Sequence, residues 1–157
     1  MLCDDIVLNG VGYTLQGNGD STGVFLQNRT NVVIKNVNIK NFNVGVKSTV
    51  GDFYRTFNGS NSIVGNNITD NAHGISLSSR ASTVVSDNYI ANNTYGVSLY
   101  SGSVFRNNRF ESNLYSIDDS GYGGASDIDA SNTVNGKPVY YWVNQHNKTV
   151  PFDTQGS

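Results

Sequence analysis

The sequence predicts an all-β fold, a right-handed, single-stranded parallel β-helix of about five coils. The chain repeats itself about every 22 residues, and the copies align one apolar position in a column of Ile39, Ile68, Ile90 and Phe110. Six residues later a second column holds Gly45, Gly74, Gly96 and Ser116. The apolar positions are separated by Asn, Asp, Ser and Gly, which leaves too little room for helices and is typical of short strands.

Each predicted coil carries three strands, and each strand centres on one apolar column. The first column contains Ile34, Ile63, Val85 and Phe105, the second starts at Ile39, and the third contains Val46, Ile75, Val97 and Ile117. An earlier, less regular coil is indicated by Ile6, Leu8, Tyr13, Leu15, Gly23, Val24 and Leu26. Copies that cannot bury an apolar face alone must stack, and parallel crossovers are nearly always right-handed.

One copy of the repeat contains an insertion. The step from Ile39 to Ile68 is roughly seven residues longer than the step from Ile68 to Ile90, and the extra residues fall near 51–58. An insertion at one point of a repeat predicts a loop, and long loops on a rigid scaffold commonly carry recognition. The candidate ligand-binding residues of this loop are Phe53, Tyr54, Arg55 and Phe57.

The tail is predicted to cap the stack. We expect one domain over residues 1–157, with coils over 1–120 and a C-terminal cap over 121–157. Residues 139–143 alternate and are rich in strand formers, which favours a strand or hairpin over the last coil. The same Tyr-Tyr-Trp patch could instead form a ligand platform. The first coil has no comparable cover, so it is a potential joint to a preceding domain or another subunit.

The composition favours an exported protein. Charged residues make up 14% of the chain, well under the usual quarter. The net charge is −2, and the Lys and Arg residues are scattered, which argues against nucleic-acid binding. Neither a signal peptide nor a membrane span is expected in this segment. Because the chain opens almost directly on a strand, we interpret it as a piece of a longer protein of the cell surface, the periplasm or the extracellular space.

Two repeat units and one tail segment resemble a known family. They are residues 66–77, residues 88–99 and, above all, the segment Asn-Gly-Lys-Pro-Val-Tyr-Tyr-Trp at 135–142. They are similar to the NosD family of right-handed parallel β-helix proteins. That family includes a periplasmic accessory protein for copper-site assembly in nitrous oxide reductase. It also includes archaeal surface proteins described as carbohydrate-binding or sugar-hydrolysing. The resemblance implies a fold and a location more than an activity.

The sequence contains four potential copper ligands. Copper sites use imidazole, thiolate or thioether groups, and the chain offers His73, His146, Cys3 and Met1. The repeat places no two of them in one column. His73 takes the position that Val44, Tyr95 and Tyr115 take in other coils, which favours a packing role. No metal is therefore predicted, and a copper site at His73 is the alternative.

Enzymatic cleavage of a sugar chain would depend on the positions of the carboxylates. Hydrolysis needs two carboxylates that flank a glycosidic bond, and no column within the repeats holds two. Four acids cluster in sequence at the end of the last coil, namely Asp118, Asp119, Asp127 and Asp129. They are the alternative catalytic residues or a calcium site, and they fit turns equally well. No catalytic residue and no cofactor is predicted, with calcium or copper as the alternative.

Binding without catalysis fits the sequence better. Tyr95 and Tyr115 recur at one register and could stack on sugar rings, although a Tyr at this position could equally be wedged into the corner of the coil. Two Asn columns are predicted to form structural ladders between coils, at 66, 88, 108 and at 71, 93, 113. We therefore predict a structural and binding module. Its expected partners are polysaccharides, other surface proteins or neighbouring domains of a longer chain. The alternatives are a carbohydrate-active enzyme and a copper-handling accessory protein.

Overall fold

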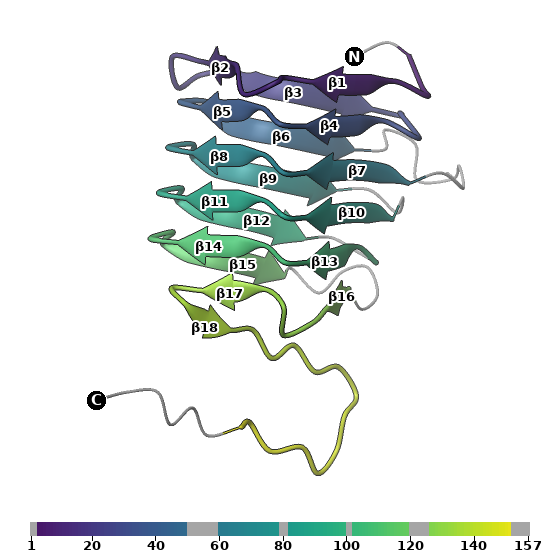
Figure 1. Cartoon of the computed structure of the whole chain (residues 1–157), viewed down its shortest axis with the longest axis vertical. Helices are drawn as coiled ribbons and strands as arrows, with labels where there is room; N and C mark the ends of the chain where they lie inside the picture. The colour runs from purple at the N-terminus through teal and green to yellow at the C-terminus, as the bar shows by residue number, and fades with distance from the viewer. Residues whose placement is uncertain (1–2, 50–59, 79–81, 100–101, 120–125, 152–157) are drawn as a thin grey trace.

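The chain winds into a stack of coils, each built from three short strands (Figure 1). This computed structural model describes residues 3–49, 60–78, 82–99, 102–119 and 126–151. The first coil contains β1 (Val7–Asn9), β2 (Thr14–Gln16) and β3 (Thr22–Gln27), and the second contains β4 (Val33–Lys35), β5 (Asn38–Lys40) and β6 (Val44–Thr49). The third contains β7 (Asn61–Val64), β8 (Asn67–Thr69) and β9 (His73–Ser78).

The stack continues in the same order to its C-terminal end. The fourth coil contains β10 (Thr83–Ser86), β11 (Tyr89–Ala91) and β12 (Tyr95–Leu99), and the fifth contains β13 (Val104–Arg106), β14 (Arg109–Glu111) and β15 (Tyr115–Asp119). A partial sixth turn contains β16 (Asp127–Ile128), β17 (Thr133–Val134) and β18 (Lys137–Pro138). The five predicted coils are therefore confirmed.

Three parallel sheets run along the stack. Sheet A has the order β1-β4-β7-β10-β13-β16, sheet B has β2-β5-β8-β11-β14-β17-β18, and sheet C has β3-β6-β9-β12-β15. Ile39 pairs with Ile68, Ile68 with Ile90, and Ile90 with Phe110, as the repeat predicts. Sheets A and B lie side by side in Figure 1, with sheet C behind them. The predicted parallel β-helix is confirmed.

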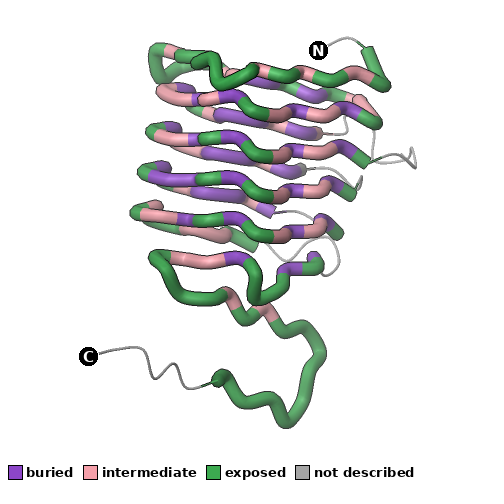
Figure 2. Tube along the Cα trace, in the orientation of Figure 1, coloured by how far each residue is buried: buried purple, intermediate pink, exposed green. Residues whose placement is uncertain are grey.

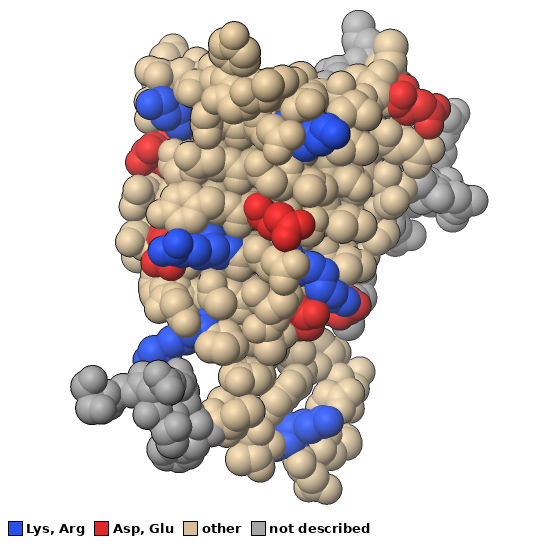
Figure 3. All heavy atoms as spheres, viewed as in Figure 1, with Lys and Arg blue, Asp and Glu red and all other residues tan. Residues whose placement is uncertain are grey.

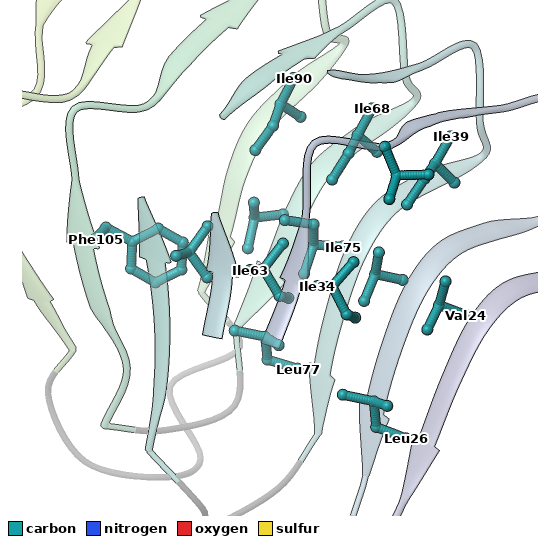
Figure 4. Close-up of a cluster of buried hydrophobic side chains, with 14 of the residues drawn as sticks. Val24, Leu26, Ile34, Ile39, Ile63, Ile68, Ile75, Leu77, Ile90 and Phe105 are labelled. Carbon is teal, nitrogen blue, oxygen red and sulfur yellow. The ribbon is translucent and has the colours of Figure 1, made fainter. Parts of the chain in front are cut away.

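The aligned apolar columns fill the interior of the stack. Ile34, Ile63, Val85 and Phe105 are fully buried, and so are Ile39, Ile68, Ile90 and Phe110. Figure 4 shows six of them between the sheets, namely Ile34, Ile63, Phe105, Ile39, Ile68 and Ile90, and Figure 2 shows burial recurring at the same place in successive coils. Each such side chain contributes about 1.5–3 kcal/mol, so the columns are the main source of cohesion between coils.

The glycine column is required because neighbouring coils approach too closely to leave room for a Cβ. A Cβ added to Gly45 or Gly74 would lie 2.6 Å from the carbonyl oxygen of the next glycine in the column. A Cβ on Gly96 would lie 2.5 Å from the Ser116 carbonyl oxygen. Ser116 itself lies on β15, the last strand of sheet C. Among the described residues no further strand of that sheet lies beneath it, so this position tolerates a side chain.

The predicted asparagine ladders are confirmed. The Asn88 side chain accepts hydrogen bonds from the Asn66 backbone and side-chain amides, at 2.9 and 3.0 Å. Its own amide donates to Ile63 O at 2.8 Å and to Asn108 Oδ1 at 3.0 Å. The first ladder extends one step beyond the prediction, because Asn108 bonds to Asn132 in the same way. The second ladder joins Asn71, Asn93 and Asn113.

The left-handed backbone at the corners belongs to different residues from the ladders. Before the first ladder, φ is positive at Asn36, Gly65, Asp87 and Asn107, and before the second at Asn41, Asp70, Asn92 and Ser112. In the third, fourth and fifth coils one residue turns the chain and the next is a ladder asparagine, whereas in the second coil the next residues are the buried Val37 and Phe42. Asn, Asp and Gly tolerate this backbone best, which explains why the corners are rich in them.

The structure changes the predicted boundary of the cap. Parallel pairing does not stop near residue 120, because β16 pairs with β13 and β17 pairs with β14. A C-terminal hairpin is present, but it is formed by β17 and β18. The described residues 139–143 form no strand. The reason is the turn at Asn135 and Gly136, where φ is +48° and +77°, which reverses the chain before Val139.

Beyond the hairpin the chain still covers the end of the core. Val139 and Tyr141 pack against the hydrophobic cluster. The Tyr141 hydroxyl donates a hydrogen bond to Asp119 Oδ2 at 2.6 Å. Burial, and then this bond, raise the pKa of Tyr141 to about 12. The cap is therefore a hairpin followed by an anchored, non-strand segment.

The opposite end of the stack is less covered. Leu15 is 38% exposed, whereas Ile39, Ile68 and Ile90 in the same column are fully buried. The strands β1, β2 and β3 are each the last strand of their sheet. The first coil is therefore open on its outer side among the residues that the structure describes.

Candidate binding surfaces

Four of the predicted ligand-binding residues belong to the inserted loop. Phe53, Tyr54, Arg55 and Phe57 all lie outside the described residues. Their assignment as ligand-binding residues stays a prediction. The flanking strands β6 and β9 pair in register, with Val46 opposite Ile75.

The predicted aromatic column is a stack of rings. The His73 and Tyr95 ring centroids lie 4.7 Å apart with an interplanar angle of 7°, and Tyr95 and Tyr115 lie 5.0 Å apart at 19°. Both faces of the Tyr95 ring are therefore covered by neighbouring rings, so a sugar cannot stack on it. Tyr115, on the last described strand of sheet C, is 52% exposed, and no ring of the described residues lies beyond it in the column.

His73 has a packing environment rather than a metal-binding one. Its Nδ1 lies 3.4 Å from the Ser98 hydroxyl, and its ring stacks on Tyr95. Among the residues that the structure describes, no group of three or more His, Cys, Asp or Glu could hold a metal ion. Cys3 and His146 are both exposed. The chemistry around His73 therefore does not fit copper.

Two acids of the predicted cluster are engaged by one arginine. Arg106 Nη2 lies 2.5 Å from Asp127 Oδ2, and Arg106 Nε lies 3.1 Å from Asp129 Oδ2. Asp129 also accepts hydrogen bonds from the Ser131 hydroxyl and backbone amide. These bonds from Ser131, and then the Arg106 charge, lower the pKa of Asp129. Asp127 and Asp129 thus anchor the sixth turn to β13.

The other two acids lie on a different sheet. Asp118 and Asp119 are adjacent on β15, so their side chains point to opposite faces. Asp119 accepts the Tyr141 hydrogen bond, while Asp127 lies on β16 of sheet A. The structure therefore does not bring the four acids together on one face.

A groove that the sequence analysis did not predict lies at the corner between sheets A and B. It is a shallow surface, largely open to solvent, with a volume of about 610 Å³. It extends over the first four coils, because each of them contributes corner residues to its wall. Its polar lining residues are Asn9, Asn36, Asn38, Asn66, Asn67 and Asp87.

Tyr89 is the aromatic residue of this groove. It lies on β11, is 39% exposed, and pairs across the sheet with Asn67 on one side and Arg109 on the other. The Arg109 guanidinium lies 5.5 Å from the ring centroid and covers that side of the ring. Arg109 is itself held by Glu111, with 2.8 Å between Nε and Oε1. The side of the ring toward Asn67 borders the groove.

The amides beside Tyr89 offer unused hydrogen-bonding atoms. Among the described residues, the Asn67 side chain has no hydrogen-bond partner, so its oxygen and nitrogen are both available. Asn38 uses its Nδ2 to donate to Gly12 O at 2.6 Å, and Asn36 donates to Asn9 at 3.1 Å. Asp87 accepts from Asn107 Nδ2 at 3.2 Å. The groove therefore presents both donors and acceptors next to an aromatic ring.

A strained turn closes the N-terminal end of the groove. Tyr13 N donates to Gly10 O at 2.8 Å, and both central residues have positive φ, +49° at Val11 and +82° at Gly12. This is the geometry of a type I′ turn, which strongly favours Asn or Gly at the position of Val11. A β-branched residue with positive φ is an outlier. Val11 is nevertheless 73% exposed over the groove, and such strain commonly marks a functional site.

Replacing Val11 with Asn is expected to stabilise the protein. The change relieves the left-handed strain, and we expect the free energy of unfolding to rise by about 1 kcal/mol. Urea denaturation followed by circular dichroism measures it. The control is Val7→Asn, an exposed valine of the same coil without positive φ, which should be neutral or destabilising. Equal effects of the two substitutions would contradict the strain at Val11.

One sequence signal could have indicated the groove. Tyr89 is the single aromatic residue in a column otherwise made of Thr14, Asn38, Asn67, Arg109 and Thr133. The column also borders the left-handed corners, where the chain bends. In the sequence the corner residues are typical of turns, and their pattern alone does not predict a shared surface.

The charged residues around the groove are dispersed. Figure 3 shows basic and acidic side chains interspersed over the face that sheets A and B share in Figure 1. In the described part of the chain, no helix is long and apolar enough to cross a membrane.

Comparison with known proteins identifies the class of fold. The family model of the right-handed β-helix region matches residues 13–135. This match confirms the predicted right-handed winding. No curated protein and no solved structure matches the chain significantly. Because the matched region covers most of the sequence and all three sheets, the chain belongs to the right-handed β-helix family.

Proposed function

We propose that this β-helix is a glycan-binding module and that the groove between sheets A and B is its binding site. The observation that carries the proposal is the groove itself, where one side of an exposed tyrosine ring adjoins a row of side-chain amides. The sequence alone predicts glycan recognition at Tyr95, Tyr115 and the inserted loop. The proposed site is a different surface.

The lining of the groove suits a neutral sugar. A pyranose ring presents C–H groups on its faces and hydroxyls around its rim, and the hydroxyls both donate and accept hydrogen bonds. A tyrosine face contacts the C–H groups, and an asparagine amide supplies one acceptor and two donors. Tyr89 and Asn67 would therefore hold one sugar between them. Asp87 would accept hydroxyl hydrogens.

Binding fits the groove better than cleavage. Hydrolysis of a glycosidic bond needs a pair of carboxylates on either side of it. Asp87 is the one carboxylate among the described residues that line the groove. A single acid can bind hydroxyls but cannot act as both acid and base or nucleophile. We therefore favour recognition over carbohydrate-active catalysis.

We extend the proposal to where the protein acts. The low charge content and the NosD resemblance both favour a module of the cell surface, the periplasm or the extracellular space. Its partners would be polysaccharides there, with other surface proteins as the alternative. NosD-like membership remains a finer prediction within the right-handed β-helix family.

Replacing Tyr89 with Ala is expected to weaken glycan binding at least about tenfold, because the change removes the ring on which the sugar stacks. A glycan array would first identify the ligand, and calorimetry would then give Kd for wild type and variant. Tyr115→Ala is the matched control, because Tyr115 is also half-exposed but lies on sheet C.

Two results would contradict the assignment of the groove as the glycan-binding site. If Tyr115→Ala removed binding and Tyr89→Ala did not, the site would lie on the aromatic column of sheet C. If no glycan on the array bound the folded wild-type protein, the glycan-binding proposal itself would fail. A third substitution, Asn67→Ala, should weaken binding without changing stability, because the Asn67 side chain is exposed.

A further inference from the structure

Gly65 leaves a gap in the row of corner side chains that borders the groove. The row follows the turns between sheets A and B, which lie one above another in Figure 1, and it consists of Asn36, Gly65, Asp87 and Asn107. All four residues have positive φ. Asparagine and aspartate therefore provide this backbone in the other three coils, and Gly65 is the one member of the row without a side chain.

Packing does not require this glycine. A Cβ added to Gly65 would have a single neighbour within 4 Å, Asn36 Oδ1 at 3.4 Å, which is an ordinary contact. The glycines of sheet C differ, since a Cβ on Gly74 would lie 2.6 Å from a backbone oxygen. Asparagine also tolerates the φ of +64° found at Gly65. The glycine thus serves no need of the fold, and its effect is a notch in the groove, which we call the Gly65 notch.

Two hydrogen-bond acceptors bound the Gly65 notch. Elsewhere in the row the side chains bond from coil to coil, because Asn36 Nδ2 donates to Asn9 Oδ1 at 3.1 Å and Asn107 Nδ2 donates to Asp87 Oδ1 at 3.2 Å. At Gly65 this series is interrupted. Among the described residues, nothing donates to Asn36 Oδ1 or to Asp87 Oδ2. One free acceptor therefore lies on each side of the notch.

Asp87 also brings an unbalanced negative charge to the notch. It forms no ion pair among the described residues, and both arginines of the next coil are held elsewhere. Arg106 binds two aspartates of the sixth turn, and Arg109 binds Glu111. In the described part of the chain, neither Lys nor Arg lines the groove. Two acceptors and a negative charge favour a group that donates hydrogen bonds and carries a positive charge.

We propose that the groove prefers glycans that contain amino sugars, and that the Gly65 notch receives the ammonium group. The inference rests on the proposed glycan site and adds its ligand class. The contacts with Tyr89 and Asn67 are open to any pyranose ring, neutral ones included. Asn67 follows Gly65 by two positions and Tyr89 follows Asp87 by two positions, so a ring held between them lies beside the notch.

Three common sugar substituents differ in what they offer the notch. An ammonium group donates three hydrogen bonds and accepts none, so it can bind Asn36 Oδ1 and Asp87 Oδ2 together. A hydroxyl has one hydrogen to donate, so it can satisfy only one of the two. An acetamido group has one N–H and adds a carbonyl oxygen, which would face the same acceptors. The notch therefore favours the ammonium group and disfavours the acetamido group.

The first test compares three ligands that differ in this substituent alone. They are tetrasaccharides of glucosamine, glucose and N-acetylglucosamine with the same linkage, and titration calorimetry of the full chain gives each Kd. The glucosamine oligomer should bind about fivefold more tightly than the glucose oligomer, which is the upper range for an exposed charge pair. The N-acetylglucosamine oligomer should bind most weakly. Added salt should reduce the advantage of glucosamine.

The outcomes separate this inference from the proposed function. If the glucose or N-acetylglucosamine oligomer bound as tightly as the glucosamine oligomer, the preference would be refuted and the glycan site would stand. If none of the three bound while another glycan did, the inference alone would again fail. If no glycan bound the folded protein but a lysine-rich peptide did, the groove would recognise protein ammonium groups, and both proposals would fail.

Replacing Asp87 with Asn tests the charge and keeps the shape of the side chain. The variant should bind the glucosamine oligomer about fivefold more weakly than the wild type, with unchanged affinity for the glucose oligomer. Asp70→Asn is the matched control, because Asp70 is exposed and has positive φ at the corner between sheets B and C. It should change neither affinity. An Asp87→Asn variant that kept the preference for glucosamine would overturn the proposal.

Replacing Gly65 with Asn tests the notch itself. Asn36 and Asn107 show that the row accepts this residue type, and the new amide can donate to Asn36 Oδ1, so the melting temperature should not fall. Binding of the glucosamine oligomer should weaken at least about tenfold, because the side chain occupies the notch. Wild-type affinity and selectivity in this variant would overturn the proposal. A large loss of stability would do so too, because it would show that the fold itself needs the glycine.

Discussion

Replacing Asn88 with Asp is expected to lower the free energy of unfolding by about 3–5 kcal/mol. The wild-type side chain is buried and donates to Ile63 O and Asn108 Oδ1 while it accepts from Asn66. A carboxylate has almost the same shape, but its second oxygen would face two acceptor oxygens. The change therefore replaces two hydrogen bonds with repulsion and buries a charge.

The pH dependence of the Asn88→Asp variant provides a second readout. Burial and the two facing oxygens disfavour the charged carboxylate, so its pKa is raised in the folded state. A group with a raised folded pKa supports stability below its unfolded pKa and loses that contribution as the pH rises through the folded value. The variant should therefore be closest to wild type in acid and fall behind it toward neutral pH.

Urea denaturation at several pH values measures both effects. The control is Asn67→Asp, one position from the ladder residue Asn66, where the side chain is exposed. This substitution should cost less than about 0.5 kcal/mol. If Asn88→Asp were as mild as Asn67→Asp, the ladders would not be structural and the account of the interior given above would be wrong.

Replacing Gly74 with Ala is expected to destabilise the protein by about 3 kcal/mol. The added Cβ would lie 2.6 Å from Gly96 O and 3.2 Å from Asn93 Nδ2. The first of these atoms is backbone, so the clash can be relieved only by moving two hydrogen-bonded coils apart. A separation at this point also lengthens the bonds of the second asparagine ladder.

The matched control lies in the same column. Ser116→Ala keeps a Cβ at the end of the column, where the described part of the chain places no further strand of sheet C, and should change stability by less than about 0.5 kcal/mol. Thermal and urea unfolding of both variants test the comparison. A Gly74→Ala protein as stable as Ser116→Ala would show that the coils can spread freely, against the close packing described here.

The repeat in the sequence was enough to predict the strand register. Ile68 must pair with Ile39 and Ile90 because each strand hydrogen-bonds to its copies in the neighbouring coils, so equal spacing in sequence becomes vertical alignment in space. The asparagine ladders followed from the same alignment. Periodicity predicts what recurs in every coil, and both features recur.

Structural features that occur only once, and do not recur from coil to coil, were harder to predict. The hairpin depends on the local turn at Asn135 and Gly136, while the strand formers of residues 139–143 indicated a strand that the structure lacks. The aromatic column was placed correctly, but the consequence of its close spacing, that Tyr95 has no free face, became clear only from the ring geometry.

The groove was missed for a related reason. Its wall combines Tyr89 and Asn67, which share one column, with Val11, which lies in a turn outside the repeat. The side chains of that column differ from coil to coil, so the repeat alone does not indicate a binding surface. A concave surface depends on the angle between two sheets, which the apolar pattern does not specify. Its strained residue, Val11, occupies a turn that exists only in the first coil.

Ser116 marks the end of sheet C in the part of the chain that the structure describes. Each glycine of this column is required because the next coil lies too close to leave room for a Cβ. The first residue with a side chain in the column therefore marks the last described strand of sheet C. The number of strands in sheet C therefore depends on the residue at this column position in each coil, and not on the length of the chain. Lengthening sheet C by one coil would require Ser116→Gly first, whereas inner coils could be duplicated or deleted as whole units without any such change.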